Sequence, residues 1–546
     1  MQLRRLRRNV FGDSAAVSAC EKGKQWKVAL GILDGMPQAQ VQQNVYSFSS
    51  LLSASEKGHQ WLLALICLAA MPTKAVRPNV ISVSAAISAS EKGGQWQCAL
   101  SLFGGLFESK VQINVICLNA AISACEKGGQ WEHALNLFEA ALDATVQPNV
   151  ISFSAAISAC EKASRWEQAM AAFRAIAELS LQPTLISYNA AISACEKGGQ
   201  WQQALSVFGE MLREKVQPDT ISYNASISAS EKGGQWQCAL SLFGGLFESK
   251  VQINVISLNA AISACEKGGQ WEHALNLFEA ALDATVQPNV ISFSAAISAC
   301  EKASRWEQAM AAFRAIAELS LQPTLISYNA AISACEKGGQ WQQALSVFGE
   351  MLREKVQPDT ISYNASISAS EKGGQWQQGL GLFLAMLRET LDPELITYNA
   401  VISACESCGQ WQQALSVFGA MLWEAVKPDS ISYNASISAC EKGGQWQRAL
   451  ILFSGVLECP TATTVSPVSC HAAVRACEKG GQWQQVFRLL ETSKRQQLTQ
   501  LTVATLDAAV NASQKAQLCQ EAAKLLRSCS TEAAAMLAKG FLPWWM

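Results

Sequence analysis

The side chains best suited to covalent or metal chemistry are few in this 546-residue chain, and they form no catalytic pattern. The four histidines are isolated, and none starts the H-x-E pattern with a following C-x-x-C that a zinc deaminase requires. The recurrent Gly-Gly pair lacks the lysine and hydroxyl of a phosphate-binding loop. We therefore expect no enzymatic activity, no cofactor and no metal. The histidines are His59, His133, His273 and His471.

The spacing of the 19 cysteines indicates a packing role for most of them. Ten share one position of a repeated pattern in which other copies carry serine, and free cysteine packs as a small apolar side chain. The C-x-x-C at Cys405 and Cys408 lacks the second pair that a four-ligand zinc site needs. We expect small buried side chains and a reducing compartment. The cysteines are Cys20, Cys125, Cys160, Cys195, Cys265, Cys300, Cys335, Cys405, Cys440 and Cys477, and the serines are Ser55, Ser90, Ser230 and Ser370.

The elements that must position these side chains are copies of one phrase, ISYNAAISACEKGGQWQQALSVF, followed by a stretch ending in VQPD or VQPN. Its tryptophans are spaced by 35 residues. A constant period in this range indicates a solenoid of stacked repeats. The tryptophans are Trp96, Trp131, Trp166, Trp201, Trp236, Trp271, Trp306, Trp341, Trp376, Trp411 and Trp446.

Each repeat is expected to be a helical hairpin, as the interval 220–254 illustrates. Apolar or small residues recur at three- and four-residue steps over 221–230, which indicates a helix with one buried face. The Gly-Gly pair then breaks the helix, and a second apolar series over 236–247 indicates a second one. In other copies a proline such as Pro218 ends the connector, because proline cannot continue a helix.

The predicted fold is therefore all-α: a right-handed superhelical α-solenoid of 14 to 15 repeats of 35 residues. Residues 10–502 hold fourteen hairpins, 503–539 a degenerate capping repeat with Cys519 in place of tryptophan, and 540–546 an apolar tail. Insertions at 460–464 and near Thr499 loosen the register there. The first thirteen repeats are 10–44, 45–79, 80–114, 115–149, 150–184, 185–219, 220–254, 255–289, 290–324, 325–359, 360–394, 395–429 and 430–466.

Part of the array is present twice. Residues 87–237 recur almost letter for letter as 227–377, with Cys117 replaced by Ser257. The copy is either a four-repeat duplication or an error of the gene model.

Composition agrees with a solenoid that has a continuous core, because 49% of the residues are hydrophobic and 16% are charged. No apolar run reaches the roughly 18 to 20 residues that span a bilayer, so we expect no membrane role. Residues 1–9 carry four arginines and no acid, as the remnant of an organelle-import leader would. The first repeat already begins near Val10, so the leader is short, and whether a longer one has been truncated stays open. The repeats leave no room for an appended editing or nuclease domain.

Net charge is −2, but a lysine follows a glutamate near the end of the first helix in almost every repeat. Stacked once per repeat, these lysines would form a ladder able to follow phosphates. The alternative is a solvated Glu-Lys face. The recurrent tryptophan has two readings as well, stacking on bases or packing between hairpins, and we favour packing. The lysines are Lys22, Lys57, Lys92, Lys127, Lys162, Lys197, Lys232, Lys267, Lys302, Lys337, Lys372, Lys442 and Lys479.

With its 35-residue period, two helices per repeat, and the phrases ISYNAAIS, EK, AL..F..ML and VQPD in fixed order, the chain resembles a pentatricopeptide-repeat protein over residues 10–539. It departs from the usual pattern in the GGQW turn. The tetratricopeptide pattern fits worse, because its tryptophan opens the first helix.

The resemblance implies that single-stranded RNA is read at one base per repeat. The fifth and last residues of each repeat would set specificity, since short amides, hydroxyls and carboxylates match a base edge with donors or acceptors. The fifth residues are Ser14, Ser49, Ser84, Asn119, Ser154, Asn189, Asn224, Asn259, Ser294, Asn329, Asn364, Asn399 and Asn434. The last residues are Asn44, Asn79, Asn114, Asn149, Thr184, Asp219, Asn254, Asn289, Thr324, Asp359, Glu394, Asp429 and Ser466.

The second residue of each repeat would lie between neighbouring bases, again by resemblance. These are Ile81, Ile116, Ile151, Ile186, Ile221, Ile256, Ile291, Ile326, Ile361, Ile396 and Ile431. Two plainer interpretations remain open. The isoleucines suit a core, and Asn or Ser near a helix start suits a cap. Against caps, the fifth residue lies about a turn inside the helix, where neither residue is a strong helix former.

The family's code assigns adenine to Ser with Asn, uracil to Asn with Asp, a pyrimidine to Asn with Asn, and cytosine to Asn with Ser. The expected target from 5′ to 3′ is A, A, A, pyrimidine, unassigned, U, pyrimidine, pyrimidine, unassigned, U, unassigned, U, C. The Ser/Thr and Asn/Glu repeats fall outside the code, and Glu394 would bring a charge near phosphates. These repeats are candidate spacers.

The function that follows is sequence-selective binding of single-stranded RNA by a monomer. It would act by occupancy in organellar RNA processing, stabilisation or translation, with a separate RNA-processing enzyme as partner. The expected location is a mitochondrion or plastid. The alternative is a protein-interaction scaffold whose groove holds a peptide, and it would show neither salt dependence nor base preference.

Overall fold

A computed structural model describes residues 9–108, 114–143, 147–249, 251–283, 286–458, 467–495 and five positions between 505 and 512. These residues form 28 helices and no strand. The helices are α1 Val10–Lys22, α2 Trp26–Gln38, α3 Val45–Lys57, α4 Trp61–Thr73, α5 Val80–Lys92, α6 Trp96–Glu108, α7 Val115–Lys127, α8 Trp131–Asp143, α9 Val150–Lys162, α10 Trp166–Glu178, α11 Leu185–Lys197, α12 Trp201–Arg213, α13 Thr220–Lys232, α14 Trp236–Glu248, α15 Val255–Lys267, α16 Trp271–Asp283, α17 Val290–Lys302, α18 Trp306–Glu318, α19 Leu325–Lys337, α20 Trp341–Arg353, α21 Thr360–Lys372, α22 Trp376–Arg388, α23 Leu395–Ser407, α24 Trp411–Trp423, α25 Ser430–Lys442, α26 Trp446–Glu458, α27 Pro467–Lys479 and α28 Trp483–Arg495.

Every repeat has the same internal plan. The odd-numbered first helix begins at the repeat's first residue, and the even-numbered second helix begins at its seventeenth, which is the tryptophan. In the turn between them, the second glycine has a φ of 63° to 71°, a left-handed conformation that glycine adopts without strain. The expectation of an all-α solenoid of helical hairpins is confirmed. The basic leader, the insertions at 460–464 and 499, most of the capping repeat and the apolar tail lie outside the described residues.

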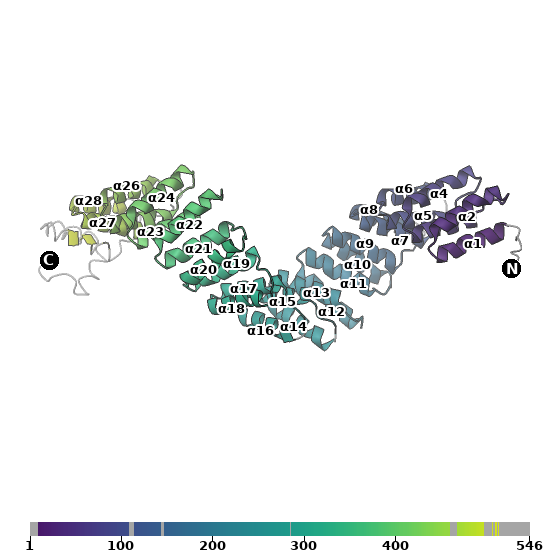
Figure 1. Cartoon of the computed structure of the whole chain (residues 1–546), viewed down its shortest axis with the longest axis horizontal. Helices are drawn as coiled ribbons and strands as arrows, with labels where there is room; N and C mark the ends of the chain where they lie inside the picture. Colours follow the sequence, from purple (N-terminus) through teal and green to yellow (C-terminus); the bar gives the residue numbers. More distant parts are fainter. Residues whose placement is uncertain are drawn as a thin grey trace. The chain divides into compact units, whose positions relative to one another are not determined.

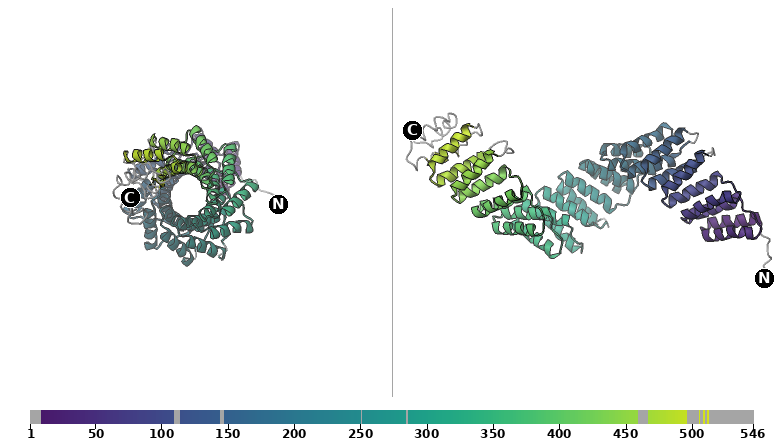
Figure 2. Two further views of the ribbon diagram at one scale, coloured as in Figure 1. Left: turned by 90° about the vertical axis from the view of Figure 1, so that its left-hand side faces the viewer. Right: turned by 90° about the horizontal axis from the view of Figure 1, so that it is seen from above.

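The chain divides into two compact units, Met1–Gly268 with Glu279–Gln287, and Gly269–Phe278 with Pro288–Met546. Within each unit the hairpins stack in chain order (Figure 1). Each first helix packs against the first helices before and after it, from α1 to α15 in one unit and from α17 to α27 in the other. Between the described parts of second helices no comparable contact occurs, so the first helices form the tightly packed row. The right-hand view of Figure 2 shows this stacking from another direction.

The close packing of first helices explains their small residues. In α11 the buried side chains are Ser187, Tyr188, Ala190, Ala191, Ile192, Ala194 and Cys195. A row of Ala, Ser and Cys lets neighbouring helix backbones approach, while tyrosine and isoleucine fill the space beneath the second helices. The expectation for the repeated cysteine position is confirmed from Cys125 onward, where the cysteines are buried. Burial raises the pKa of Cys125, Cys160 and Cys265 to about 11, which makes these thiols inert.

Aromatic pairs join successive repeats. The phenylalanine of a second helix meets the tyrosine of the next first helix edge to face, as Phe208 meets Tyr223 with 5.2 Å between ring centroids. Phe348 and Tyr363 repeat this geometry, also at 5.2 Å. Such pairs add about 0.5 to 1.5 kcal/mol beyond area burial. Their recurrence fixes the register of one hairpin on the next.

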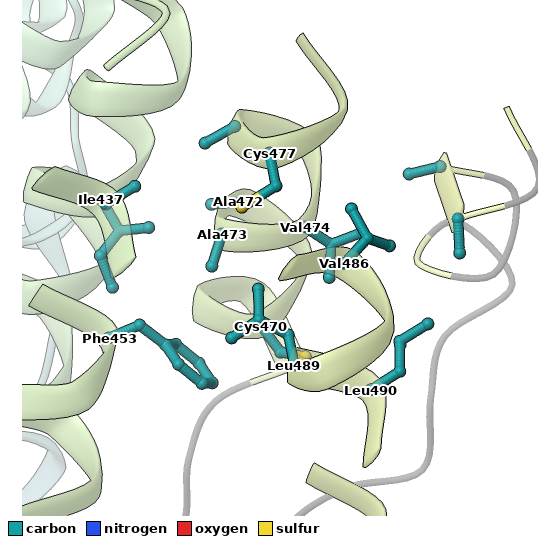
Figure 3. Close-up of a cluster of buried hydrophobic side chains, with 14 of the residues drawn as sticks. Ile437, Phe453, Cys470, Ala472, Ala473, Val474, Cys477, Val486, Leu489 and Leu490 are labelled. Atoms are coloured by element: carbon teal, nitrogen blue, oxygen red, sulfur yellow. The ribbon is translucent and has the colours of Figure 1, made fainter. Parts of the chain in front are cut away.

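At the C-terminal end of the described array, one apolar cluster joins α25 to α28 (Figure 3). Ile437 and Phe453 face Cys470 and Ala473 of α27, and Val486 of α28 lies on the other side of α27. Ala508, Ala509 and Ala512 belong to the same cluster, so chain beyond α28 contributes to this core. In the part of the chain described here, no helix has the length and apolarity needed to cross a bilayer.

A second kind of contact between successive repeats is that of a tryptophan with a glycine of the next repeat. A methyl group built on Gly233 would overlap the indole of Trp201 from the preceding repeat, and Gly198 meets Trp166 in the same way. Trp131 faces a repeat that carries Ala163 at this position, and there Arg165 lies over the indole at 4.9 Å from the ring centroid. The tryptophan therefore packs between hairpins, as we favoured from the sequence.

We expect Gly233→Val to destabilise the array, because the larger side chain would overlap the Trp201 indole and force it to move. Overpacking of this kind costs about 1 to 3 kcal/mol. The measurement is the urea midpoint of unfolding followed by circular dichroism.

The matched control is Gly209→Val on α12, where an added Cβ meets nothing within 4 Å. This variant is expected to be neutral or slightly stabilising, because glycine is a poor helix former. Equal midpoints for the two variants would show that the tryptophan contact does not hold the repeats together.

Candidate nucleic-acid interface

In the repeats from 10–44 to 395–429, the last residue is the N-cap of the next first helix. Asp219 has extended backbone, with φ −104°, and its Oδ1 accepts the backbone N–H of Ser222 at 2.9 Å. Asn149 caps α9 in the same way, and Thr184 caps α11. The cap interpretation is thus confirmed for the last position. An aspartate or asparagine cap has a second polar atom, whereas Thr184 uses its one hydroxyl in the cap.

The fifth residue is placed beside that cap. In repeat 185–219, Asn189 Nδ2 donates to Asp219 Oδ1 at 3.0 Å, across 30 residues of sequence. The same bond is 3.0 Å from Asn329 to Asp359 and 3.2 Å from Asn399 to Asp429. The structure therefore brings together the two residues that the sequence pairs. Both members of the pair 189 and 219 are half-buried.

The aspartate caps are charged acceptors. Burial pushes the pKa of Asp219 upward, but the hydrogen bonds from the Ser222 backbone and hydroxyl and from Asn189 outweigh it and hold the pKa below its ordinary value. The pKa values of Asp359 and Asp429 are lowered by the same balance. Because Oδ1 receives the cap and Asn189, Oδ2 is the carboxylate's remaining acceptor.

An asparagine at the last position presents the opposite group. Asn149 Oδ1 accepts backbone N–H groups from Ile151 and Ser152, each at 3.1 Å, and also the amide of Asn119 at 3.2 Å. Its oxygen is therefore committed, and its NH2 is the group left to donate. At this position an aspartate therefore has an acceptor to offer a ligand, and an asparagine has a donor.

Most serines at the fifth position are too buried for their hydroxyls to contact a ligand easily. Ser84, Ser154 and Ser294 are 7% to 8% exposed, and Ser154 Oγ donates to Val150 O at 2.8 Å. Ser14 is an exception, since its hydroxyl reaches Asn44 Oδ1 at 3.4 Å. In the two Ser/Thr repeats the serine hydroxyl is buried, while Thr184 and Thr324 are exposed, so the fifth residue there offers little to a base, which suits spacers. Ser466 falls outside the described residues.

The second-position isoleucines lie on the surface, so the core interpretation is wrong. They are 55% to 65% exposed, and their side chains stand three residues before the fifth position, on the same helix face. Large exposed apolar residues also occupy this position where the sequence analysis did not place them. They are Phe11, Tyr46 and Val468, and the repeat register alone would have found them.

The lysine ladder is present, and eleven of its lysines have a carboxylate partner. They are Lys57, Lys92, Lys127, Lys162, Lys197, Lys232, Lys267, Lys337, Lys372, Lys442 and Lys479. The lysine at position 13 pairs with the glutamate at position 12 of the preceding repeat, as Lys197 does with Glu161 at 3.0 Å. Lys232 and Glu196 are 2.6 Å apart, and these two side chains are 41% and 16% exposed. Position 13 lies eleven residues, or about three turns, beyond position 2 and so shares its face. The proposed phosphate role remains a prediction.

The sequence analysis missed the residue at the third position. A buried hydroxyl stands there in most repeats, and Ser222, Ser362 and Ser432 each contact both the fifth residue and the cap before them. Its signal in the sequence is the capping-box spacing, a polar cap followed three residues later by Ser or Thr. Among the described residues no group of three or more His, Cys, Asp and Glu side chains is arranged to hold a metal ion.

The fold and this surface define a helical-hairpin repeat protein that presents one polar pair per repeat. The PPR repeat family model matches residues 183–232, 323–372 and 393–442. The Pentatricopeptide repeat domain model matches 31–92, 102–163 and 241–303. Together these matches cover more than half of the chain, and the chain belongs to the pentatricopeptide repeat family. A comparison with curated proteins finds no match.

Solved structures of pentatricopeptide repeat proteins are similar to the chain. Maize PPR10 is 18% identical, with 96% of this chain and 84% of that chain covered and a TM-score of 0.49. PPR10 in complex with an 18-nt psaJ RNA element has the same identity and a TM-score of 0.47, with 98% and 86% covered. The PPR domain of Arabidopsis thaliana PRORP1 in complex with tRNA is 16% identical, with 36% and 98% covered and a TM-score of 0.31.

The capping aspartates predict a loss of stability in acid. Their pKa values are lower in the folded chain than the ordinary value of about 3.9, so their stabilisation is complete above that value and is lost as pH falls through the lower folded pKa. We expect the thermal midpoint of the wild type to fall more steeply below about pH 4 than that of the variant carrying Asp219→Asn, Asp359→Asn and Asp429→Asn.

The comparison isolates the carboxylates because asparagine also caps first helices in this chain, as at Asn149. Parallel midpoint curves for wild type and variant between pH 6 and pH 3.5 would mean that the three caps do not titrate with folding.

Proposed function

We propose that this chain binds single-stranded RNA sequence-selectively, at one base per repeat, and acts by occupying its target. Membership of the pentatricopeptide repeat family supports RNA binding. The observation that carries base selectivity is the helix cap formed by Asp219 and its equivalents, because the cap and Asn189 use Oδ1 and would leave Oδ2 for a base.

The remaining atom matches the edges of bases in a definite way. Uracil carries a donor at N3, which suits the free oxygen of Asp219, Asp359 or Asp429. Cytosine N3 and adenine N1 are acceptors, which suit the free NH2 of an asparagine cap such as Asn149. The fifth residue then discriminates within each class. This argument supports the uracil assigned to the sixth, tenth and twelfth nucleotides of the target.

The exposed second-position residues supply the apolar part of the site. Ile186 and Ile221, at 65% and 58% exposure, lie at the starts of two successive first helices, on either side of the pair Asn189 and Asp219 in the repeat order. Apolar contact to a base face is sequence-tolerant, so these side chains would separate neighbouring bases while the pair reads one edge. Burial of such exposed isoleucines by RNA would also remove them from water.

The proposed role is organellar: RNA processing, stabilisation or translation in a mitochondrion or plastid, with a separate enzyme recruited for any cleavage or editing. A monomer that covers about one nucleotide per repeat would shield its target from nucleases or hold it unfolded. Because the pair and the isoleucines bind without making or breaking bonds, occupancy is the mechanism that these side chains support.

A second candidate is a scaffold that holds a peptide along the first-helix row. The neutralised lysine ladder favours it, because paired Lys and Glu offer little net charge to a polyanion. Salt dependence separates the two candidates, since RNA binding weakens steeply as salt rises.

The central test exchanges one capping residue. Asp219→Asn replaces the outward acceptor with a donor while keeping the cap, so the sixth nucleotide should change from uracil to cytosine. We expect the preference at that nucleotide to shift by about 1 to 3 kcal/mol, measured by filter binding with 13-nucleotide RNAs that differ only there.

The charge-matched control is Asp34→Asn on the exposed side of α2, which should leave the preference unchanged. A scrambled RNA and the DNA equivalent complete the set. Wild-type protein that binds all of them equally, or none, would overturn the proposed function.

The lysine ladder is tested through its carboxylate partners. If Lys232 contacts a phosphate, Lys232→Gln should weaken binding uniformly across sequences and reduce the salt slope by about 0.7, while Glu196→Gln should release the lysine and strengthen binding. Filter binding between 50 and 300 mM salt measures both.

If instead the ion pair only joins the repeats, both variants should lower the free energy of unfolding by a few tenths of a kcal/mol and leave the salt slope unchanged.

A further inference from the structure

The buried hydroxyl at the third position is shared by the two base-reading residues of the preceding repeat. Ser222 Oγ lies 2.5 Å from Asn189 Oδ1 and 2.9 Å from Asp219 Oδ1. Ser222 itself is fully buried, so it cannot touch a ligand. Any effect of this side chain on recognition must pass through the pair.

The direction of these hydrogen bonds follows from counting donors. Asp219 Oδ1 already accepts the Ser222 backbone N–H and the Asn189 amide. The serine hydroxyl accepts the Asp219 N–H at 3.2 Å and has one hydrogen to give, and the shorter contact is to Asn189 Oδ1. The amide of Asn189 is thus held at both ends, with its oxygen toward Ser222 and its nitrogen toward Asp219.

The arrangement recurs wherever Asn stands before Asp. Ser362 lies 2.5 Å from Asn329 Oδ1, and Ser432 lies 2.5 Å from Asn399 Oδ1. Repeat 360–394 keeps the contact with a different residue, because Thr397 Oγ1 donates to Asn364 Oδ1 at 2.6 Å. Threonine therefore performs the same task as serine at this position.

Repeat 220–254 shows what happens when the hydroxyl turns away. Ser257 Oγ is directed at its own cap, 2.8 Å from Asn254 O and 3.1 Å from Asn254 Oδ1. Asn224 Oδ1, the fifth-position oxygen of this repeat, is then buried without a hydrogen-bond partner. A free amide oxygen leaves the orientation of the amide undecided.

We propose that the third-position hydroxyl is a positioning residue for base recognition, which fixes the amide orientation of the fifth residue in the preceding repeat and so sharpens discrimination at that nucleotide. The proposal rests on the function proposed above. A repeat with the hydroxyl engaged, such as 185–219, discriminates more strongly than one where it is turned away, such as 220–254.

The test removes one hydroxyl and uses the rest of the chain as reference. Ser222→Ala should lower the preference for uracil over cytosine at the sixth nucleotide about fivefold to tenfold, the value of one hydrogen bond. Ser222→Thr should restore it. The tenth nucleotide, faced by the identical trio Asn329, Asp359 and Ser362, should keep its preference in every variant.

The matched control is Ser226→Ala, one turn further along α13. Ser226 is also fully buried, and its hydroxyl donates only within the helix, to Ser222 O at 2.8 Å. Other repeats carry alanine there, as at Ala121 and Ala156, so this change should alter neither fold nor preference.

The outcomes separate the two proposals. Loss of preference confined to the sixth nucleotide supports a positioning role. Weaker binding of all RNAs with an unchanged ratio at that nucleotide, or an unchanged ratio with unchanged affinity, overturns the role of Ser222 while base recognition stands. Wild-type protein without preference at the sixth or tenth nucleotide overturns the proposed function itself.

Discussion

The structure depends on the helix cap at the junction between repeats. A first helix starts with unpaired backbone N–H groups, and in most described repeats the residue that ends the preceding repeat caps it, as Asn149 and Asp219 do. In the Asn/Asp repeats the same oxygen also accepts the amide of the fifth residue, as Asp219 Oδ1 does from Asn189. A local requirement of helix initiation therefore places the last residue beside the fifth one.

The cap works in register only because neighbouring hairpins are locked together. Three contacts at different positions of the hairpin join one repeat to the next: Phe208 with Tyr223, Gly233 with Trp201, and Lys232 with Glu196. Each contact spans a repeat boundary and recurs with the period. A shift of one residue would break all three contacts, so the spacing of the outward polar atoms is as regular as the packing that supports it.

The charges of the repeated lysines and glutamates balance one another. The lysines that form a ladder along the first helices face the glutamates of the preceding repeats, so the ladder adds little net charge to the surface. A solenoid of net charge −2 that binds RNA would then rely on base edges and apolar contact more than on a positive field. Selectivity at the base edges would then be the larger part of recognition, and the orientation of each amide would matter accordingly.

The sequence by itself determined the period, the helical hairpin and the helix boundaries at the Gly-Gly turn, because these follow from local periodicity and turn chemistry. The pairing of fifth and last residues came from the resemblance to the pentatricopeptide-repeat family. It did not decide what lies across a repeat boundary. That Ile186 is exposed, that Ser154 is buried, that Lys197 meets Glu161, and that Ser222 holds Asn189 depend on contacts between residues some 30 to 36 apart. Such contacts are set by how one hairpin rotates on the next, and that rotation comes from tertiary packing of small residues between first helices.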